Sequence, residues 1–280
     1  KVMEVYGDYL FKLFPCWLLS PENVSTILPL KKDMFDLVLF DEASQVFIEN
    51  TIPSIYRGSR IVVEGDAKQL RPTTTFMRRY MGANVDDDVD FSTQAALEVE
   101  SLLDLAVSRF NSTNITYHYR SRNSELIDFS NKAFYNGKLQ IAPNGSKNIR
   151  QKPIERIMAK GVWENGKNVM EAKKVVELTK QILKTRKHNE TIGIITFNSE
   201  QETCIEDLID KQCAVDEEFR TLYIKETNRI ENGEDVSLFI ENLENIQGDE
   251  RDIIIFSIGY ARNNFGKVNS LFGSLSNEGG

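Results

Sequence analysis

An uninterrupted apolar run that ends in two acids constrains the fold of this chain more than any other feature. Residues 37–40, Leu-Val-Leu-Phe, show no polar alternation and lead directly into Asp41 and Glu42. Such a run predicts a strand covered on both faces, as in the parallel sheet of an α/β protein. Ligands of open α/β sheets bind at the carboxyl ends of the strands. The two acids therefore stand where chemistry is expected, although acids that merely solvate a strand end would give the same pattern.

A second short apolar run, residues 61–63, also ends in polar groups, because Asp66 and Gln69 follow it. If the two strands are parallel neighbours, both polar clusters lie at one edge of the sheet. There Asp41 can hold Mg²⁺, which prefers oxygen ligands, and Glu42 can orient or deprotonate a water. Asp66 and Gln69 can bridge a metal-bound water and a phosphate oxygen. The repetition favours a functional site over simple solvation of two strand ends.

Periodicity and turn residues predict the other elements. A short buried strand that contains Cys16 is predicted before Pro21, and a Ser-x-x-Glu capping box opens a helix at Ser199. The highly charged residues 214–236 predict a solvated hairpin or loop. The remaining predicted helices cover residues 22–28, 46–56 with an interruption at Pro53, 95–110, 124–135 and 169–187, and the remaining predicted strands cover 115–119, 192–197 and 253–257, with an edge strand within 138–165.

Composition excludes several classes of protein. The 280 residues are 41% hydrophobic, which is enough for one large or two ordinary domains. The net charge of −8 argues against a surface coated in basic residues, but it leaves a local nucleic-acid groove open. No run approaches the roughly 18 apolar residues of a membrane span, and no signal peptide is visible. The three cysteines and two histidines show no metal-site spacing, so we expect no zinc site. The cysteines also form no evident disulfide framework, so we expect a reducing, intracellular setting.

Five blocks of this chain, taken in order, resemble the superfamily 1 helicases. The resemblance is to the branch that contains the nonsense-mediated-decay helicase, senataxin and the Okazaki-fragment nuclease-helicase. One block is weak evidence, but five in the family's order and approximate spacing are strong. The blocks are residues 35–45 as the Walker B strand (motif II), residues 65–70 as motif III, Tyr119-Arg120 as motif IV, residues 192–201 as the strand and turn after it, and Gln247-Gly248-Asp249-Glu250 as motif V.

The resemblance implies an α/β protein built from two RecA-like P-loop NTPase domains, each with a parallel sheet and both incomplete here. Residues 1–112 would be the carboxyl-terminal part of the first domain, and residues 113–280 would be the second. ATP would bind in the cleft between them with Mg²⁺. The partner would be single-stranded DNA or RNA, along which enzymes of this branch usually move from 5′ to 3′. We expect a monomeric motor, although nothing in the sequence fixes the oligomeric state.

The resemblance also implies roles for individual residues. Asp41 would hold Mg²⁺ through its water shell, and Glu42 would activate the hydrolytic water. Gln69 would sense the γ-phosphate, and Arg120 would act as an arginine finger that stabilises the transition state. The remaining nucleotide contacts would come from Asp66, Gln247, Gly248 and Glu250, and the contacts with the nucleic-acid backbone from Ser20, Pro21, Thr196 and Ser257.

Two departures from the family pattern qualify these expectations. The chain has no Gly-x-x-x-x-Gly-Lys-Ser/Thr loop, which in this family precedes motif II, and it ends before motif VI. It also begins at Lys1 rather than methionine. We therefore expect that this chain is a fragment that binds ATP poorly and does not hydrolyse it by itself. The parent protein would be the enzyme that hydrolyses ATP. Two alternatives stay open: a degenerate helicase fold that serves as a scaffold or clamp, and a nuclease that uses Asp41, Glu42 and Asp66 around two metals.

Overall fold

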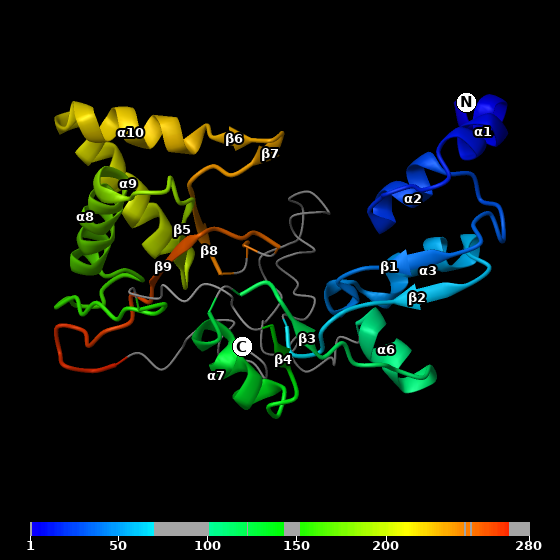
Figure 1. Cartoon of the computed structure of the whole chain (residues 1–280), viewed down its shortest axis with the longest axis horizontal. Helices are drawn as coiled ribbons and strands as arrows, with labels where there is room; N and C mark the ends of the chain where they lie inside the picture. Colours follow the sequence, from blue (N-terminus) through cyan, green and yellow to red (C-terminus); the bar gives the residue numbers. More distant parts are fainter. Residues whose placement is uncertain are drawn as a thin grey trace. The chain divides into compact units, whose positions relative to one another are not determined.

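The computed structural model describes residues 2–69, 101–121, 123–142, 152–243, 245–246 and 248–268 (Figure 1). The chain divides into two compact units, residues 1–153 (unit 1) and 154–278 (unit 2). Both units combine helices with parallel strand pairs, which confirms the predicted α/β class. The boundary predicted after residue 112 concerns the family's two domains and stays a prediction. No helix among the described residues is long and apolar enough to cross a membrane.

Unit 1 is centred on the parallel pair β1 (Val38–Phe40) and β2 (Ile61–Val63). The 3₁₀ turn η1 (Ala43–Gln45) and helix α3 (Ile48–Arg57) connect the two strands. Helix α6 (Leu102–Arg109) packs against η1 and β2, and a capping box formed by Ser101 and Asp104 begins it. The small core combines Phe40, Ala43, Leu102 and Leu103 with partly buried Val38, Ile55, Ile61 and Val63.

The prediction that β1 is covered on both faces is wrong for the described residues. Leu39 is 54% exposed and Val62 is 46% exposed, whereas Phe40 is buried. Side chains alternate across a strand, so these values place one face of the β1–β2 pair against α3 and α6 and leave the other open. The apolar run is therefore genuine, but within the described residues only one of its faces has a covering layer.

A buried arginine at the end of α3 binds the chain segment that follows α2 (Pro21–Ile27). Helix α1 spans Val2–Leu13, and α2 packs against α3. Arg57 is 3% exposed, and its guanidinium donates to the carbonyl oxygens of Leu28 at 3.0 Å, Pro29 at 3.0 Å and Pro53 at 2.7 Å. The prediction that Pro53 interrupts this helix is wrong, because α3 continues through it. The proline removes a single N–H donor, whose acceptor would have been the carbonyl of Glu49, an exposed residue.

The strand predicted over residues 15–20 does not form. This segment has no regular structure, Cys16 is exposed and Leu18 is 94% exposed. The aromatic residues that suggested a buried strand pack locally instead, since the Trp17 ring lies 5.3 Å from that of Phe11. The Trp17 indole also donates to the Phe14 carbonyl at 2.7 Å. Local aromatic contacts thus replace the pairing that a strand would need.

A small parallel pair and one helix complete unit 1. Strands β3 (Tyr117–His118) and β4 (Gln140–Ile141) flank α7 (Glu125–Phe134) in the sequence. The helix ends at Phe134, and Asn136 and Gly137, which both have positive φ, follow it. Its apolar side chains Leu126, Phe129 and Phe134 are exposed, and Asn131 is the buried residue of the helix. The Asn131 amide bonds both the N–H and the carbonyl of Leu139, which fixes the turn into β4.

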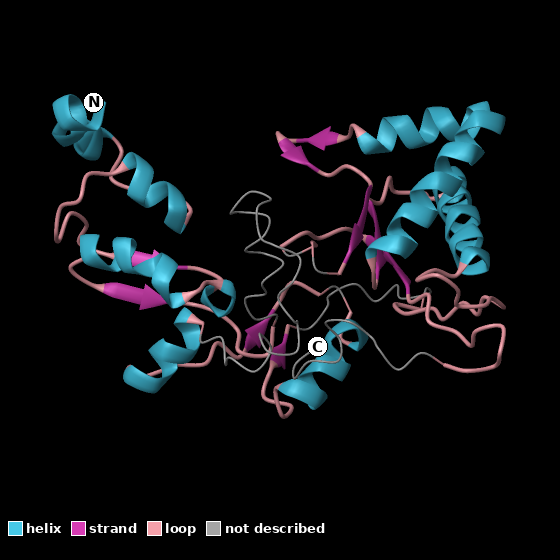
Figure 2. Ribbon diagram, turned by 180° about the vertical axis from the view of Figure 1, so that it is seen from behind, coloured by secondary structure: helices cyan, strands magenta, loops and turns pink. Residues whose placement is uncertain are grey.

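Unit 2 contains a three-stranded parallel sheet in the order β8 (Phe239–Asn242), β5 (Ile192–Thr196) and β9 (Ile253–Ser257) (Figure 2). Every residue of β5 is buried. Helices α8 (Val169–Thr185) and α9 (Ser199–Val215) pack on each other and on the sheet. The helices predicted over residues 169–187 and from Ser199 are both present. Their buried faces contain Ala172, Val175, Val176, Leu183, Cys204, Ile205 and Ile209.

Two predictions for unit 2 are wrong. Residues 217–227 form helix α10 (Glu217–Thr227), and only the antiparallel hairpin β6 (Ile230–Glu231) and β7 (Glu234–Asp235) matches the predicted loop. The high charge hides two inward-facing residues, Phe219 and Glu226, which are 0% and 2% exposed. The capping box at Ser199 is also absent, because Asn198 is the N-cap and Glu202 accepts from the Asn242 amide at 2.9 Å instead.

Candidate functional site

The carboxyl ends of β1 and β2 form one edge, as predicted. Phe40 pairs with Val63 in parallel register. Beyond the strands, the Glu64 N–H donates to the Phe40 carbonyl at 2.8 Å, and the Ala43 N–H donates to the Glu64 carbonyl at 2.9 Å. These bonds tie the two strand ends together, so the segments that carry Asp41 and Asp66 leave the sheet side by side.

Asp41 and Glu42 are both exposed at this edge. The Asp41 carboxylate accepts from the Glu42 N–H at 2.9 Å, and Glu42 has a φ of 51°. Left-handed backbone is costly for a residue with a side chain and is concentrated at functional sites. This turn projects two adjacent carboxylates beyond the strand, so they can take a hard cation and a water.

Gly65 allows η1 to approach β2 closely. A Cβ at this position would lie 3.1 Å from the backbone nitrogens of Ala43 and Ser44, and 3.2 Å from Leu103. Any larger residue would push η1 outward and move the preceding Glu42 with it. The glycine therefore makes room for this close contact between η1 and the end of β2.

The loop after β2 is organised around the Asp66 carboxylate. One carboxylate oxygen accepts from the Lys68 N–H at 2.9 Å, and the other accepts from the Gln69 amide at 3.3 Å. The Tyr135 hydroxyl donates to that second oxygen. Burial and the bond to Asp66 raise the pKa of Tyr135, so it remains a donor at ordinary pH. Sequence reasoning missed Tyr135, because nothing in its local pattern points to a partner 69 residues away.

Two buried polar atoms of η1 have no hydrogen-bond partner among the described residues. They are the hydroxyl of Ser44, which is 2% exposed, and the amide nitrogen of Gln45. Buried polar groups are ordinarily satisfied, so these two indicate a missing polar partner at this edge. With the two exposed carboxylates, they fit a polyphosphate and its Mg²⁺ in chemical type. No group of three His, Cys, Asp or Glu side chains within the described residues could share a metal ion.

Arg120 lies two residues beyond β3 and is exposed. The short strand that was predicted to deliver it is therefore present. His118 accompanies it, and its ring nitrogen lies 2.8 Å from the Ser121 hydroxyl. This contact ties the two sides of Arg120 together, because it closes a turn from residue 118 to residue 121.

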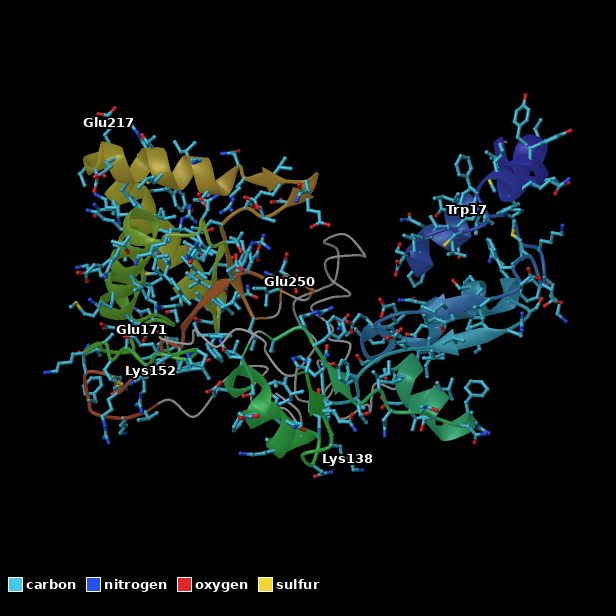
Figure 3. The ribbon with its side chains drawn as sticks, viewed as in Figure 1. Trp17, Lys138, Lys152, Glu171, Glu217 and Glu250 are labelled. Atoms are coloured by element: carbon cyan, nitrogen blue, oxygen red, sulfur yellow. The ribbon has the colours of Figure 1, made fainter. Side chains whose placement is uncertain are left out.

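Thr196 and Ser257 lie at the carboxyl edge of the sheet in unit 2. They are partners in the β5–β9 register, so the structure brings these two predicted residues together. Both are 0% exposed. Thr196 donates to the Asn198 carbonyl at 2.9 Å, and Ser257 donates to Glu171 at 2.9 Å (Glu171 is labelled in Figure 3). Either side chain would have to open these bonds to reach a phosphate, and their role as nucleic-acid contacts stays a prediction.

Glu171 and Gln201 extend this internal network. Glu171 also accepts from the Gly259 N–H at 2.8 Å, and the Gln201 amide donates to Ser257 at 3.0 Å and accepts from the Asn168 N–H at 2.7 Å. Gln201 and Asn168 are buried, so the network fixes the starts of α8 and α9 to the end of β9. Sequence reasoning had not assigned Glu171 a function.

The other predicted residues that the structure describes lie in a loop or at the start of a helix. Gly248 has a φ of 86°, and Glu250 is exposed (Figure 3), whereas Gln247 lies outside the described residues. Ser20 is the N-cap of α2, where it accepts from the Asn23 N–H at 3.4 Å, and Pro21 is the first residue of that helix. Proline suits this position because it needs no N–H donor there.

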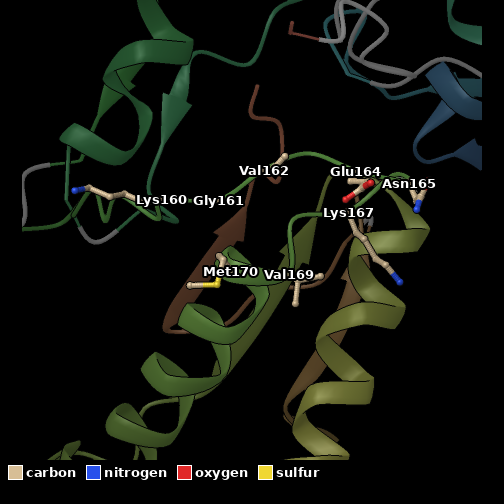
Figure 4. Close-up of a pocket in the computed structure, with 8 residues that line it drawn as sticks. All are labelled: Lys160, Gly161, Val162, Glu164, Asn165, Lys167, Val169 and Met170. Carbon is tan, nitrogen blue, oxygen red and sulfur yellow. The ribbon is translucent and has the colours of Figure 1, made fainter. Parts of the chain in front are cut away.

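A shallow pocket of about 560 Å³ lies beside the start of α8 (Figure 4). Its two lysines, Lys160 and Lys167, extend in different directions in Figure 4, so they do not converge on one anion. It is lined by Lys160, Gly161, Val162, Glu164, Asn165, Lys167, Val169 and Met170.

Comparison with known proteins decides the family. A family model described as an AAA domain matches residues 99–277. This chain belongs to that family, within the senataxin-like branch of the superfamily 1 helicases. The predicted family is therefore confirmed. The model covers Arg120, Thr196, Glu250 and Ser257, whereas Asp41 and Glu42 lie outside the matched residues.

Relatives extend the similarity across nearly the whole chain. An uncharacterized ATP-dependent helicase of Mycoplasma pneumoniae is 39% identical over 276 residues, which are 97% of this chain and 24% of that protein. A second one, from Mycoplasma genitalium, is 38% identical over 279 residues, or 98% and 24%. The probable helicase senataxin of Homo sapiens is 29% identical over 192 residues, which are 64% of this chain and 7% of senataxin. The chain thus spans about a quarter of the length of the Mycoplasma relatives.

Proposed function

We propose that this chain forms part of the motor core of an ATP-dependent helicase or translocase that moves 5′ to 3′ along a single strand of DNA or RNA. One observation carries the proposal: the parallel β1–β2 pair brings the segments of Asp41 and Asp66 to one edge. The relatives named ATP-dependent helicase support it. Because the chain spans only part of those relatives, the activity belongs to a longer protein that carries these residues.

In this proposal the exposed edge of unit 1 binds the nucleotide. Asp41 holds Mg²⁺ through water, and Glu42 accepts a proton from the attacking water. Gln69 contacts the γ-phosphate from its loop, which Asp66 fixes. Mg²⁺, when bound, supplies charge that stabilises the phosphoryl oxygens. Arg120 adds positive charge in the transition state.

Other parts of the chain complete the motor. Glu250 contacts the ribose with help from Gln247 and Gly248. Contacts with the nucleic-acid backbone are sequence-blind and suit a motor that steps along any strand. They involve Ser20, Pro21, Thr196 and Ser257, and for the two buried hydroxyls we propose that the neighbouring backbone groups make the contact.

The function is tested by measuring ATP hydrolysis and duplex unwinding by the longer protein, with single-stranded DNA and RNA compared as stimulants. We expect a strand to raise the rate of hydrolysis, and tailed duplexes to open only when the 5′ tail is present. Residues 1–280 alone are expected to show no turnover, because the chain lacks the Gly-Lys-Ser/Thr phosphate loop. Strand binding without hydrolysis would instead support the alternative of a scaffold or clamp.

A further inference from the structure

The Asp66 carboxylate joins two segments that are far apart in the sequence. Gln69 and Tyr135 both donate to the same carboxylate oxygen, Gln69 from 3.3 Å. The second oxygen accepts from the Lys68 N–H at 2.9 Å. Asp66 therefore holds the loop of Gln69 through two bonds from its own segment and one from the end of α7.

The position of Tyr135 is fixed by its own surroundings. Its N–H donates to the Asn131 carbonyl at 3.2 Å at the end of α7, and its carbonyl accepts from the Lys138 N–H at 3.0 Å. The chain then turns through Asn136 and Gly137 into β4, which pairs with β3. Arg120 lies two residues beyond the end of β3. The segment of Arg120 is thus connected to the loop of Gln69 through β3, β4, the turn after α7 and finally the Tyr135 hydroxyl.

We propose that Tyr135 is a positioning residue that holds the Gln69 loop through Asp66 and couples it to the segment that carries Arg120. This inference rests on the proposed function, in which Gln69 contacts the γ-phosphate. Without the hydroxyl, one oxygen of Asp66 is left to Gln69 alone. The Gln69 amide then bonds its own loop more strongly, and its place relative to Arg120 is no longer fixed.

The expected effect falls on the chemical step. Loss of one hydrogen bond to a charged group lowers kcat about 10-fold, if that bond is fully used in the transition state. The KM for ATP stays within about twofold, because Tyr135 does not touch the nucleotide. Since the pKa of Tyr135 is raised, the ratio of wild-type to variant kcat stays constant from pH 7 to pH 9.

The test is a double-mutant cycle in the longer protein that carries these residues, with Tyr135→Phe made in the wild type and in Asp66→Ala. We expect Tyr135→Phe to lower kcat in the wild type and to have no further effect in Asp66→Ala, because the acceptor is already gone. Tyr223→Phe is the matched control: its hydroxyl is partly buried in unit 2, makes no hydrogen bond among the described residues, and should leave kcat unchanged.

Each result decides the proposal. It is overturned by a wild-type kcat in Tyr135→Phe, by an equal loss in the Asp66→Ala background, or by a fall in melting temperature that accounts for the lost activity through unfolded protein. If the wild-type protein itself shows no strand-stimulated hydrolysis, the proposed function fails and this inference fails with it. Robust wild-type hydrolysis with an unaffected Tyr135→Phe variant rejects only the coupling.

Discussion

Strand β5 of unit 2 is buried along its whole length between β8 and β9, whereas the β1–β2 pair of unit 1 leaves Leu39 and Val62 about half exposed. The polar residues at the two sheet edges also differ in their exposure to solvent. Thr196 and Ser257 point their hydroxyls into internal hydrogen bonds, but Asp41 and Glu42 are open to solvent. Unit 2 therefore uses its strand ends to hold itself together, and unit 1 leaves its strand ends available for a ligand.

Polar residues that follow a strand in the sequence can therefore have different roles in the two units. In the described part of unit 2, a core of twelve buried residues supports the sheet. Glu171 and Gln201 form hydrogen bonds with Ser257 at the edge of this sheet. In the described part of unit 1 the core has four buried residues, and the Ser44 hydroxyl and the Gln45 amide nitrogen have no hydrogen-bond partner there. We therefore expect substitutions at the unit 1 edge to affect activity and substitutions inside unit 2 to affect stability.

The largest effect is expected from Arg120→Ala. Removing a charge that stabilises the transition state should lower kcat for ATP hydrolysis by about 10³–10⁵-fold, without a comparable change in melting temperature. The rate is measured in the longer protein with saturating single strand. Arg109→Ala serves as control, since Arg109 is exposed at the end of α6 and has no assigned role. Equal losses in both variants would remove the catalytic assignment of Arg120.

Glu226→Gln should cause the largest loss of stability. Glu226 is 2% exposed, and its carboxylate accepts from Arg186 at 2.9 Å and from Arg229 at 3.1 Å. Burial alone would raise the pKa of Glu226, but the two guanidinium groups outweigh it and hold the pKa below its ordinary value. Neutralising it leaves two buried cations without their shared partner, which should cost about 3–5 kcal/mol of the free energy of unfolding.

Urea denaturation monitors this loss, with Glu218→Gln as the control. Glu218 pairs with Lys184, but its side chain is 68% exposed, so its loss should hardly change the denaturation midpoint. A Glu226→Gln protein as stable as the wild type would show that the cluster does not anchor α10.

Matched truncations in the two sheets test the difference in burial directly. Ile194→Ala in β5 should cost about 2–5 kcal/mol because the side chain is 0% exposed. Leu39→Ala in β1 should cost at most about 0.5 kcal/mol, as for a surface position. Both are measured by urea denaturation of the chain. A loss for Leu39→Ala close to that of Ile194→Ala would show that the open face of β1 is covered in solution.

The smallest effect concerns pH. The Lys180 ammonium lies 2.6 Å from Asp216, and with the Phe219 N–H it lowers the pKa of Asp216 from 3.8 to about 2. A carboxyl whose folded pKa is depressed stabilises the protein above its unfolded pKa, and this contribution is lost as pH falls through the folded value. Asp216→Asn should therefore lower the melting temperature at pH 7, and the difference should shrink between about pH 4 and pH 2.

The control for this prediction is Asp207→Asn, an exposed acid on α9 with no hydrogen bond among the described contacts. Its effect on melting temperature should be small at both pH values. A constant gap between Asp216→Asn and the wild type down to pH 2 would contradict the assigned cause.

Much of the fold follows from periodicity in the sequence. Helix α8 was predicted from its helical periodicity, and strand β5 from its apolar run. Helix α10 was missed because its charged residues conceal the inward-facing Phe219 and Glu226, and a buried acid becomes visible only with its arginine partners. The exposure of Leu39 could not be predicted either, since an apolar run does not reveal which layers cover it.

Some features of the candidate site could likewise be predicted from the sequence, and others could not. The parallel strand rule predicted that Asp41 and Asp66 would share one edge, because that rule depends only on the order of elements. The bonds from Tyr135 to Asp66 and from Ser257 to Glu171 join residues that are 69 and 86 positions apart in the sequence. No local pattern encodes such contacts. The proposed roles of the site residues stay predictions until their activity is measured.

The most direct test of the account is ATP hydrolysis by Glu42→Gln in the longer protein, measured with Mg²⁺ and single-stranded DNA or RNA. Glu49→Gln, an exposed acid on α3, is the matched control. The account predicts strand-stimulated hydrolysis in the wild type and the control, and its loss in Glu42→Gln while ATP binding is retained. Undiminished hydrolysis in Glu42→Gln would contradict the claim that the β1–β2 edge of unit 1 performs the chemistry.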